Sequence, residues 1–332
     1  MTELRQNMVT KEWVIIASER ANRPDKYAET DERPLIQDLP AYDPDCPFCV
    51  GNEERDLELE CFPAEGPWQT RVVMNKYPAL SKEGDPVRTY DGVHRQISGV
   101  GHHEIVIDHP LHNTTLAFMK PDEIHRLLET FYHRGWNLHR DPRVEHIVYF
   151  KNHGKRAGAS LPHPHSQIIG LPVVPTDIRQ RTEEARRYFD DNGKCVFCKM
   201  VEDELKDQIR LVAVSEHFVA FVLYAAPTPF HIWIIPRYHS VSYVYSLPEQ
   251  LSDLGVVLQD LLRRLYIGLR DPSYNLVIRS SPIKEISNDY FHWYIALVPR
   301  LSRTAGFELG SGMHINPSLP EACAEFLRNI KT

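Results

Sequence analysis

Short apolar runs alternate with longer amphipathic stretches along this chain of 332 residues. Runs rich in β-branched and other large apolar residues predict strands, because such side chains pack well on a pleated sheet. The predicted strands cover residues 104–108, 146–150, 232–235 and 275–278. Apolar residues three and four positions apart predict two helices, one from Pro121 through Phe131 and one over 251–265. Strands separated by single long helices favour an α+β fold.

The order of these elements repeats when the histidines are aligned. In each half a strand runs into a histidine, a helix follows, and a later strand carries a second histidine. His239 follows His112 by 127 residues, and the same offset relates His292 to His165. We therefore predict a duplication with halves over residues 1–175 and 176–332. Each half is expected to be a mostly antiparallel sheet with a long helix, and the two sheets are expected to join.

Three polar segments separate or precede these elements. The stretch 175–193 carries closely spaced charges of both signs and predicts a solvated helix between the halves. The proline-rich segment 22–45 predicts an extended loop, and the segment 81–101, with its glycine, proline and acidic residues, predicts a second loop.

Composition and charge narrow the class of protein. Hydrophobic residues make up 42% of the chain and charged residues 25%, which allows a sizeable buried core. The formal charge of −7 provides no basic excess, so no nucleic-acid partner is expected. The chain has neither a signal-peptide pattern at its start nor an apolar run long enough to cross a bilayer. We therefore expect a cytoplasmic protein with no membrane partner.

Four of the six cysteines form two C-x-x-C pairs. Tetrahedral zinc takes two such thiolates and needs two more nitrogen or sulfur ligands, which the repeated histidines supply. The two candidate sets are Cys46, Cys49, His112 and His163, and Cys195, Cys198, His239 and His292. Closed four-ligand sites are structural, and iron could replace zinc at one of them. A redox turn is the alternative for each pair, and other histidines could take a ligand place, namely His102, His103, His109 and His153.

The segment His163-Pro164-His165-Ser166-Gln167 carries the clearest chemical signal. Alternation along an extended strand places His163, His165 and Gln167 on one face. A neutral imidazole can act as nucleophile or base while a glutamine amide holds a phosphoryl oxygen, so a nucleotidyl-histidine intermediate becomes chemically accessible. A metal site or ordinary polar packing is the alternative for an isolated His-x-His pair.

Several further motifs accompany this segment over nearly the whole chain. They are Arg20-Ala21-Asn22-Arg23-Pro24, Cys46-Pro47-Phe48-Cys49, Asn75-Lys76-Tyr77-Pro78-Ala79-Leu80, Asn152-His153-Gly154, Gly158-Ala159-Ser160 and Gly306-Phe307-Glu308. With them the chain resembles the galactose-1-phosphate uridylyltransferase family of the histidine-triad superfamily. The resemblance implies duplicated histidine-triad-like halves and a homodimer.

The resemblance also implies roles for individual residues. His165 would be the nucleophile and His163 a zinc ligand that anchors the strand. Gln167 stands where hydrolases of the superfamily carry a third histidine, which is similar to the transferase and phosphorylase pattern. The nucleotide phosphates and ribose would be surrounded by Arg20, Arg23, Asn75, Asn152 and Ser160, with Glu308 near the sugar.

The sequence departs from the well-known bacterial uridylyltransferases at Ser166, at the second cysteine pair and at His314. In the first two respects it resembles the branch that includes ADP-glucose phosphorylase. We predict a ping-pong nucleotidyltransferase, with UDP-glucose and galactose 1-phosphate as leading substrates. The alternatives are an ADP-sugar phosphorylase, in which inorganic phosphate is the acceptor, and a zinc-stabilised nucleotide-binding protein without activity.

Overall fold

The computed structural model describes residues 2–20, 35–285 and 288–332. In this part of the chain, ten strands form one continuous sheet in which every neighbouring pair is antiparallel. In spatial order the strands are β10 (Leu211–Val214), β11 (Phe218–Val222), β12 (Ile232–Pro236), β14 (Tyr294–Pro299), β13 (Tyr274–Arg279), β8 (His146–His153), β9 (His165–Leu171), β7 (His102–Ile107), β4 (Thr70–Met74) and β3 (Glu58–Phe62). The predicted strands are all present, and the α+β prediction is confirmed.

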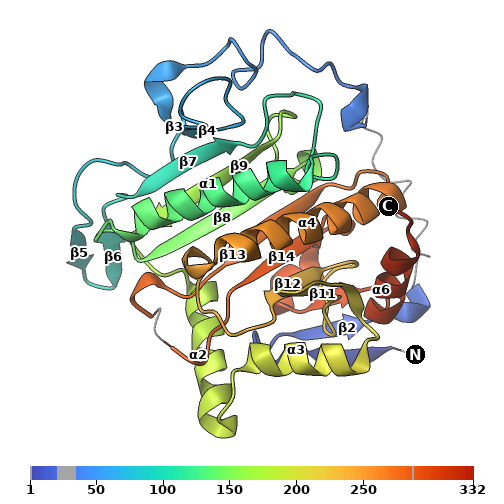
Figure 1. The fold of residues 1–332 in the computed structure, drawn as a ribbon. Coiled ribbons are helices and arrows are strands. Elements are labelled where there is room, and N and C mark those ends of the chain that lie inside the picture. Colours follow the sequence, from blue (N-terminus) through green and yellow to red (C-terminus); the bar gives the residue numbers. More distant parts are fainter. Residues whose placement is uncertain (1, 21–34, 286–287) are drawn as a thin grey trace.

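Pairing of β8 with β13 joins the two halves (Figure 1). Tyr274 lies opposite His153, and the register continues as far as Ile278 opposite Tyr149. The two predicted sheets therefore form one larger sheet, as expected. The boundary between residues 175 and 176 stays a prediction, because this sheet runs through both halves without a break.

The two long helices lie side by side on one face of the sheet (Figure 1). They are α1 (Pro121–His139) and α4 (Pro248–Leu269). Each begins with proline, which tolerates the first helical turn because the backbone N–H there has no partner within the helix. Gly255 lets the helices approach closely, since a Cβ at this position would lie 2.8 Å from the Pro121 carbonyl oxygen. Both predicted helices are confirmed, with ends that extend beyond the predicted ranges.

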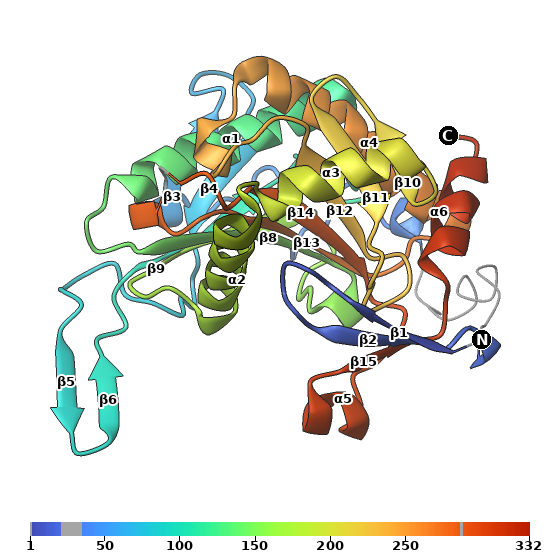
Figure 2. The same ribbon diagram turned by 90° about the horizontal axis from the view of Figure 1, so that it is seen from below.

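The opposite face of the sheet is only partly covered (Figure 2). The charged stretch after residue 175 forms α2 (Thr176–Asn192), the predicted solvated helix. A small sheet with the order β1 (Glu3–Gln6), β2 (Trp13–Ile16) and β15 (His314–Asn316) covers another part of this face. The remaining helices are α3 (Val196–Asp207), α5 (Gly306–Ser311) and α6 (Pro320–Asn329). Strands β7, β8 and β9 therefore keep part of this face free for a site.

The predicted loop over 81–101 is wrong in its centre. It contains a hairpin of β5 (Arg88–Asp91) and β6 (His94–Ile97), which projects from the body of the molecule (Figure 2). Asp91 pairs with His94, so Gly92 and Val93 form a two-residue turn, and Gly92 has a φ of 57°. Glycine at the first of two turn residues is a hairpin signal because it accepts a positive φ without strain. The residues on both sides of the turn are mostly polar, so the hydrophobic pattern did not predict strands there.

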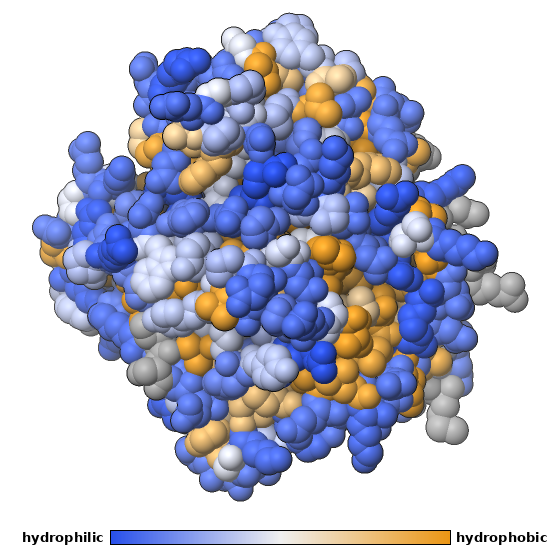
Figure 3. Space-filling model, viewed as in Figure 1, coloured by the Kyte–Doolittle hydropathy of each residue, from blue (hydrophilic) through white to orange (hydrophobic). Residues whose placement is uncertain are grey.

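The predicted loop over 22–45 lies partly outside the described residues. From residue 35 onward it is irregular, except for a 3-10 turn over Ile36–Asp38. None of the helices in the described ranges combines the length and apolarity that a bilayer crossing requires. In the view of Figure 3 polar side chains cover most of the surface, and apolar ones gather in one area between α4 and α6.

Candidate active site

His165 begins β9 on the less covered face of the sheet. The register places it beside Ile107 of β7, and it places Gln167 between Ile105 of β7 and Phe150 of β8. The Nδ1 atom of His165 lies 2.8 Å from the carbonyl oxygen of His163. A carbonyl oxygen only accepts, so Nδ1 carries the proton and the lone pair of a neutral ring lies on Nε2. The second ring nitrogen is therefore available as a nucleophile.

A buried ion pair holds the backbone of this histidine. The Lys151 ammonium donates to the His165 carbonyl oxygen at 3.0 Å and to the Asp108 carboxylate at 2.6 Å. The backbone N–H of Asp108 donates to the Pro164 carbonyl oxygen at 3.0 Å. Burial first, and the nearby Lys151 charge second, lower the pKa of His165. The ring is consequently neutral near pH 7, which a nucleophilic role requires.

Within the described ranges, two cavities meet at His165, Ser160 and Leu161. The first, of about 370 Å³, has mainly apolar walls and a few polar groups. Its apolar walls include Phe48, Leu57, Val73, Ile105 and Ile107. The second, of about 280 Å³, is lined by residues 151–155, by residues 159–165 and by the apolar side chains of Ile36 and Leu39. An apolar slot of this kind suits a flat base, and His165 lies where that slot meets the second cavity.

The structure brings several predicted site residues together around these cavities. Gln167 and Asn75 line the first cavity, Asn152 lines the second, and Ser160 lines both. Asn275 from the second half donates to the Asn152 side-chain oxygen at 2.8 Å and thereby fixes its amide.

One other predicted residue does not join this group, and two have no described side chain. Glu308 lies half-buried on α5 and lines neither cavity, and its carboxylate accepts the Ala305 backbone N–H. Arg23 lies outside the described residues. Arg20 ends a 3-10 turn, and its side chain is outside the description as well.

The first predicted ligand set lies close to the catalytic strand. The ligand atoms of Cys46, Cys49, His112 and His163 lie within 4.8 Å of one another, and all four residues are buried. The Cys49 sulfur lies 3.4 Å from His112 Nδ1 and 3.6 Å from His163 Nδ1. Zinc–ligand distances of about 2.3 Å to sulfur and 2.1 Å to nitrogen imply sulfur–nitrogen separations of about 3.6 Å in a tetrahedral site. The group therefore fits such an ion.

Two features prepare these side chains for a cation. His163 donates from Nε2 to the His109 carbonyl oxygen at 2.8 Å, which leaves the Nδ1 lone pair directed at the cysteines. Burial raises the pKa of the Cys46 thiol to about 11, so a thiolate at this position needs a positive charge beside it.

The second ligand set has the same chemistry. The ligand atoms of Cys195, Cys198, His239 and His292 also lie within 4.8 Å of one another, although His239 is exposed. The Cys198 sulfur lies 3.4 Å from His239 Nδ1 and 3.6 Å from His292 Nδ1. Among the described residues these two Cys₂His₂ sets are the groups that could hold a metal ion.

The constant offset of 127 residues is wrong for the last histidine of each set. His292 takes the place of His163, because each completes a cysteine cluster, and the offset there is 129 residues. The position that corresponds to His165, the predicted nucleophile, is therefore Tyr294. The spacing between the two histidine ligands is two residues longer in the second half, which the sequence alignment of His292 with His165 does not reveal.

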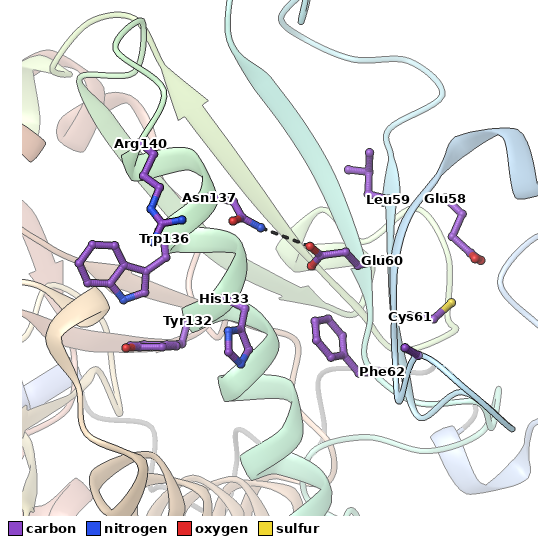
Figure 4. A pocket seen from close by; sticks show the side chains of 11 residues that line it. Glu58, Leu59, Glu60, Cys61, Phe62, Tyr132, His133, Trp136, Asn137 and Arg140 are labelled. Atoms are coloured by element: carbon purple, nitrogen blue, oxygen red, sulfur yellow. Dashed lines mark hydrogen bonds between the residues drawn. The ribbon is translucent and has the colours of Figure 1, made fainter.

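A larger cavity, of about 840 Å³, lies away from His165 between β3 and α1 (Figure 4). Trp136, Tyr132 and His133 of α1 line one side, and Phe62 of β3 stacks on the His133 ring. The side chain of Asn137 donates to Glu60 across the cavity. This cavity holds none of the predicted site residues.

Three residues near the nucleophile escaped the sequence analysis or received no role in it. Lys151 and Asp108 form the ion pair under His165, and His103 contacts Gln167. His103 was considered there only as a substitute metal ligand. The pairing of β7, β8 and β9 decides which of their side chains meet, and no local sequence pattern carries that register.

These features place a buried histidine next to a Cys₂His₂ group that could hold a metal ion, and comparison assigns the chain to a known family. Residues 1–175 match the family model "Galactose-1-phosphate uridyl transferase, N-terminal domain". The chain belongs to this family, as its motifs predicted.

Two relatives illustrate the range of the family. ADP-glucose phosphorylase of Arabidopsis thaliana is 38% identical over 99% of this chain and 93% of its own length. Galactose-1-phosphate uridylyltransferase of Thermotoga maritima is 31% identical over 100% of this chain and 99% of its own length. The crystal structure of the Arabidopsis phosphorylase with bound ADP-glucose superposes with a TM-score of 0.84 at 34% identity, covering 100% and 99% of the two chains.

Proposed function

We propose that this protein transfers a nucleotidyl group from a nucleotide-sugar to a phosphate-bearing acceptor through a covalent bond to His165. The observation that carries this proposal is the Nε2 lone pair of His165 at the meeting point of two cavities. A neutral, buried imidazole is a suitable phosphorus nucleophile, and the chain's family supports this class of reaction.

The reaction takes place in two displacements. Nε2 of His165 attacks the α-phosphorus of the nucleotide-sugar, the P–O bond to the bridging oxygen breaks, and hexose 1-phosphate leaves. The ring then carries the nucleotidyl group and a positive charge, which the hydrogen bond from Nδ1 to the His163 carbonyl oxygen stabilises. An acceptor phosphate oxygen attacks the same phosphorus, the N–P bond breaks, and the ring returns to its neutral form.

ADP-glucose and inorganic phosphate are our lead substrates, with glucose 1-phosphate and ADP as products. The higher identity to the ADP-glucose phosphorylase supports this choice over the UDP-glucose and galactose 1-phosphate that the sequence analysis favoured. Uridylyl transfer is the second candidate, because the Thermotoga uridylyltransferase matches over the whole chain. The homodimer and the cytoplasmic location stay predictions.

Zinc is the metal that we propose for both Cys₂His₂ sites. A bound ion supplies fixed geometry rather than chemistry here, because four protein ligands leave no open position. In the first half, a metal bound to His163 would fix the position of this residue. The His163 carbonyl oxygen, which orients the His165 ring, would then be fixed as well.

Intact-protein mass spectrometry after separate incubation with ADP-glucose and UDP-glucose tests the proposal, with His165→Asn as the matched variant. An adenylyl adduct from ADP-glucose alone, absent in the variant and discharged by phosphate, is the expected result. A uridylyl adduct from UDP-glucose alone would move the assignment to the uridylyltransferase. Nucleotide binding with no adduct from either donor would support the inactive nucleotide-binding alternative.

A further inference from the structure

We propose that His103 is a positioning residue that fixes the side-chain amide of Gln167, so that its N–H groups face the transferring phosphoryl group. This inference rests on the proposed function, because it concerns a second residue of the same site. His103 lies on β7 and Gln167 on the adjacent β9, on the face of the sheet that His165 shares.

The hydrogen bonds of His103 determine which ring nitrogen carries the proton. The backbone N–H of Ala79 donates to His103 Nδ1 at 3.1 Å, so Nδ1 must present a lone pair. A neutral ring then carries its proton on Nε2, which lies 2.8 Å from Gln167 Oε1. His103 is therefore the donor and the glutamine oxygen is the acceptor.

This contact decides how Gln167 can act on a phosphate. The terminal torsion of a glutamine is broad and roughly two-fold, so the free side chain presents either oxygen or nitrogen with similar ease. An amide oxygen repels a phosphoryl oxygen, whereas the amide N–H groups stabilise it. Because His103 holds the oxygen, the NH₂ group is the end of Gln167 that remains for a ligand in the first cavity.

The same ring connects Gln167 to the loop that carries Asn75. The Asn75 backbone N–H donates to the His103 carbonyl oxygen at 3.0 Å. Ala79, at the other end of this loop, is tethered to Nδ1. The loop and the catalytic strand thus meet at one imidazole, although they are far apart in the sequence.

Two substitutions separate the two hydrogen bonds of His103. In His103→Gln the amide nitrogen takes the approximate place of Nε2 and keeps a donor for Gln167. In His103→Asn the amide oxygen takes the approximate place of Nδ1, which keeps the tether to Ala79 but removes that donor. The adjacent His102 provides the control, because its ring contacts Asp141 at 2.8 Å and not Gln167.

The experiment measures single-turnover formation of the nucleotidyl adduct by His103→Asn, His103→Gln, His102→Asn, Gln167→Ala and the double variant His103→Asn/Gln167→Ala. Nucleotide affinity and melting temperature are measured alongside. We expect His103→Asn to slow adduct formation by up to about 100-fold with little change in affinity. His103→Gln should recover most of the rate, and His102→Asn should leave it unchanged.

The double variant gives the decisive result. If His103 acts through Gln167, His103→Asn has no further effect once Gln167 is alanine, since coupled residues are not additive. Losses that multiply in the double variant, or a His103→Gln variant as slow as His103→Asn, would overturn the positioning role alone. Wild-type protein that forms no adduct with ADP-glucose or UDP-glucose would instead overturn the proposed function, and this inference with it.

Discussion

Each half of the chain carries a group of two cysteines and two histidines. The halves differ in the residue that lies two positions after the last histidine of that group. In the first half that position is His165, which opens onto two cavities. In the second half it is Tyr294, whose hydroxyl accepts a hydrogen bond from Arg181 of α2 at 3.2 Å and whose ring lies 4.1 Å from Trp233. The Cys₂His₂ group is therefore common to both halves, while the residue two positions after it lines two cavities in the first half and contacts α2 and β12 in the second.

The second half also contributes directly to the first. Asn275 binds Asn152 and the Ala157 carbonyl oxygen, and it thereby supports the loop beside the nucleophile. His153 next to it donates to Asp271 at 2.6 Å and stacks on Tyr274. Residues of the second half thus support the loop beside His165.

The largest expected difference between the halves is at the nucleophile position itself. His165→Asn should lower turnover by on the order of 10⁶-fold, because it removes the group that forms the covalent bond. Tyr294→Phe, at the corresponding position, should retain activity, since it removes only a hydroxyl that binds Arg181. Steady-state kinetics and adduct mass measure both. A folded His165→Asn variant that turns over normally would remove this residue from the mechanism.

Removal of one cysteine from each half should separate the two metal sites. Cys49→Ala and Cys198→Ala should each reduce the metal content from two equivalents per chain to one. Cys49→Ala should also lower activity by roughly 100-fold, because His163 loses its anchor beside His165. Cys198→Ala should chiefly lower the melting temperature. Metal analysis and kinetics on the same samples provide the test, and equal activity losses would contradict the division of roles.

Lys151 and Asp108 offer a test of the support beneath the nucleophile. Lys151→Met leaves the Asp108 carboxylate buried without its cation, so unfolding free energy should fall by about 3–5 kcal/mol. Lys151→Met/Asp108→Leu should recover much of that stability, because no buried charge remains. Its activity should stay low, since the His165 carbonyl oxygen still lacks its donor. Chemical denaturation and kcat measure the two effects, and full recovery of kcat would show that the pair serves stability alone.

The smallest expected effect concerns the support from the second half. Asn275→Ala removes the hydrogen bonds to Asn152 and to the Ala157 carbonyl oxygen, and it should cost about 1 kcal/mol of stability. A rise in KM of a few fold should accompany it, because the loop beside the second cavity loses an anchor. An unchanged KM would show that the loop holds its geometry without the second half.

The sequence by itself determined the elements and the chemistry that depend on local spacing. Apolar periodicity predicted α1, α4 and the central strands, and the C-x-x-C pairs with repeated histidines predicted both ligand sets. The His165 and Gln167 alternation predicted one catalytic face. These features follow from side chains close together in the chain, where the strand and helix periods alone decide direction.

Only the tertiary structure decided how distant strands align. It showed that His292 takes the same place in the second ligand set as His163 takes in the first. Tyr294 is therefore the residue of the second half that corresponds to His165. It placed Lys151, Asp108 and His103 around β9, and it left Glu308 apart from both cavities. The physical reason is that strand register depends on turns, insertions and packing across the whole sheet, and a shift of one residue sends every side chain to the opposite face.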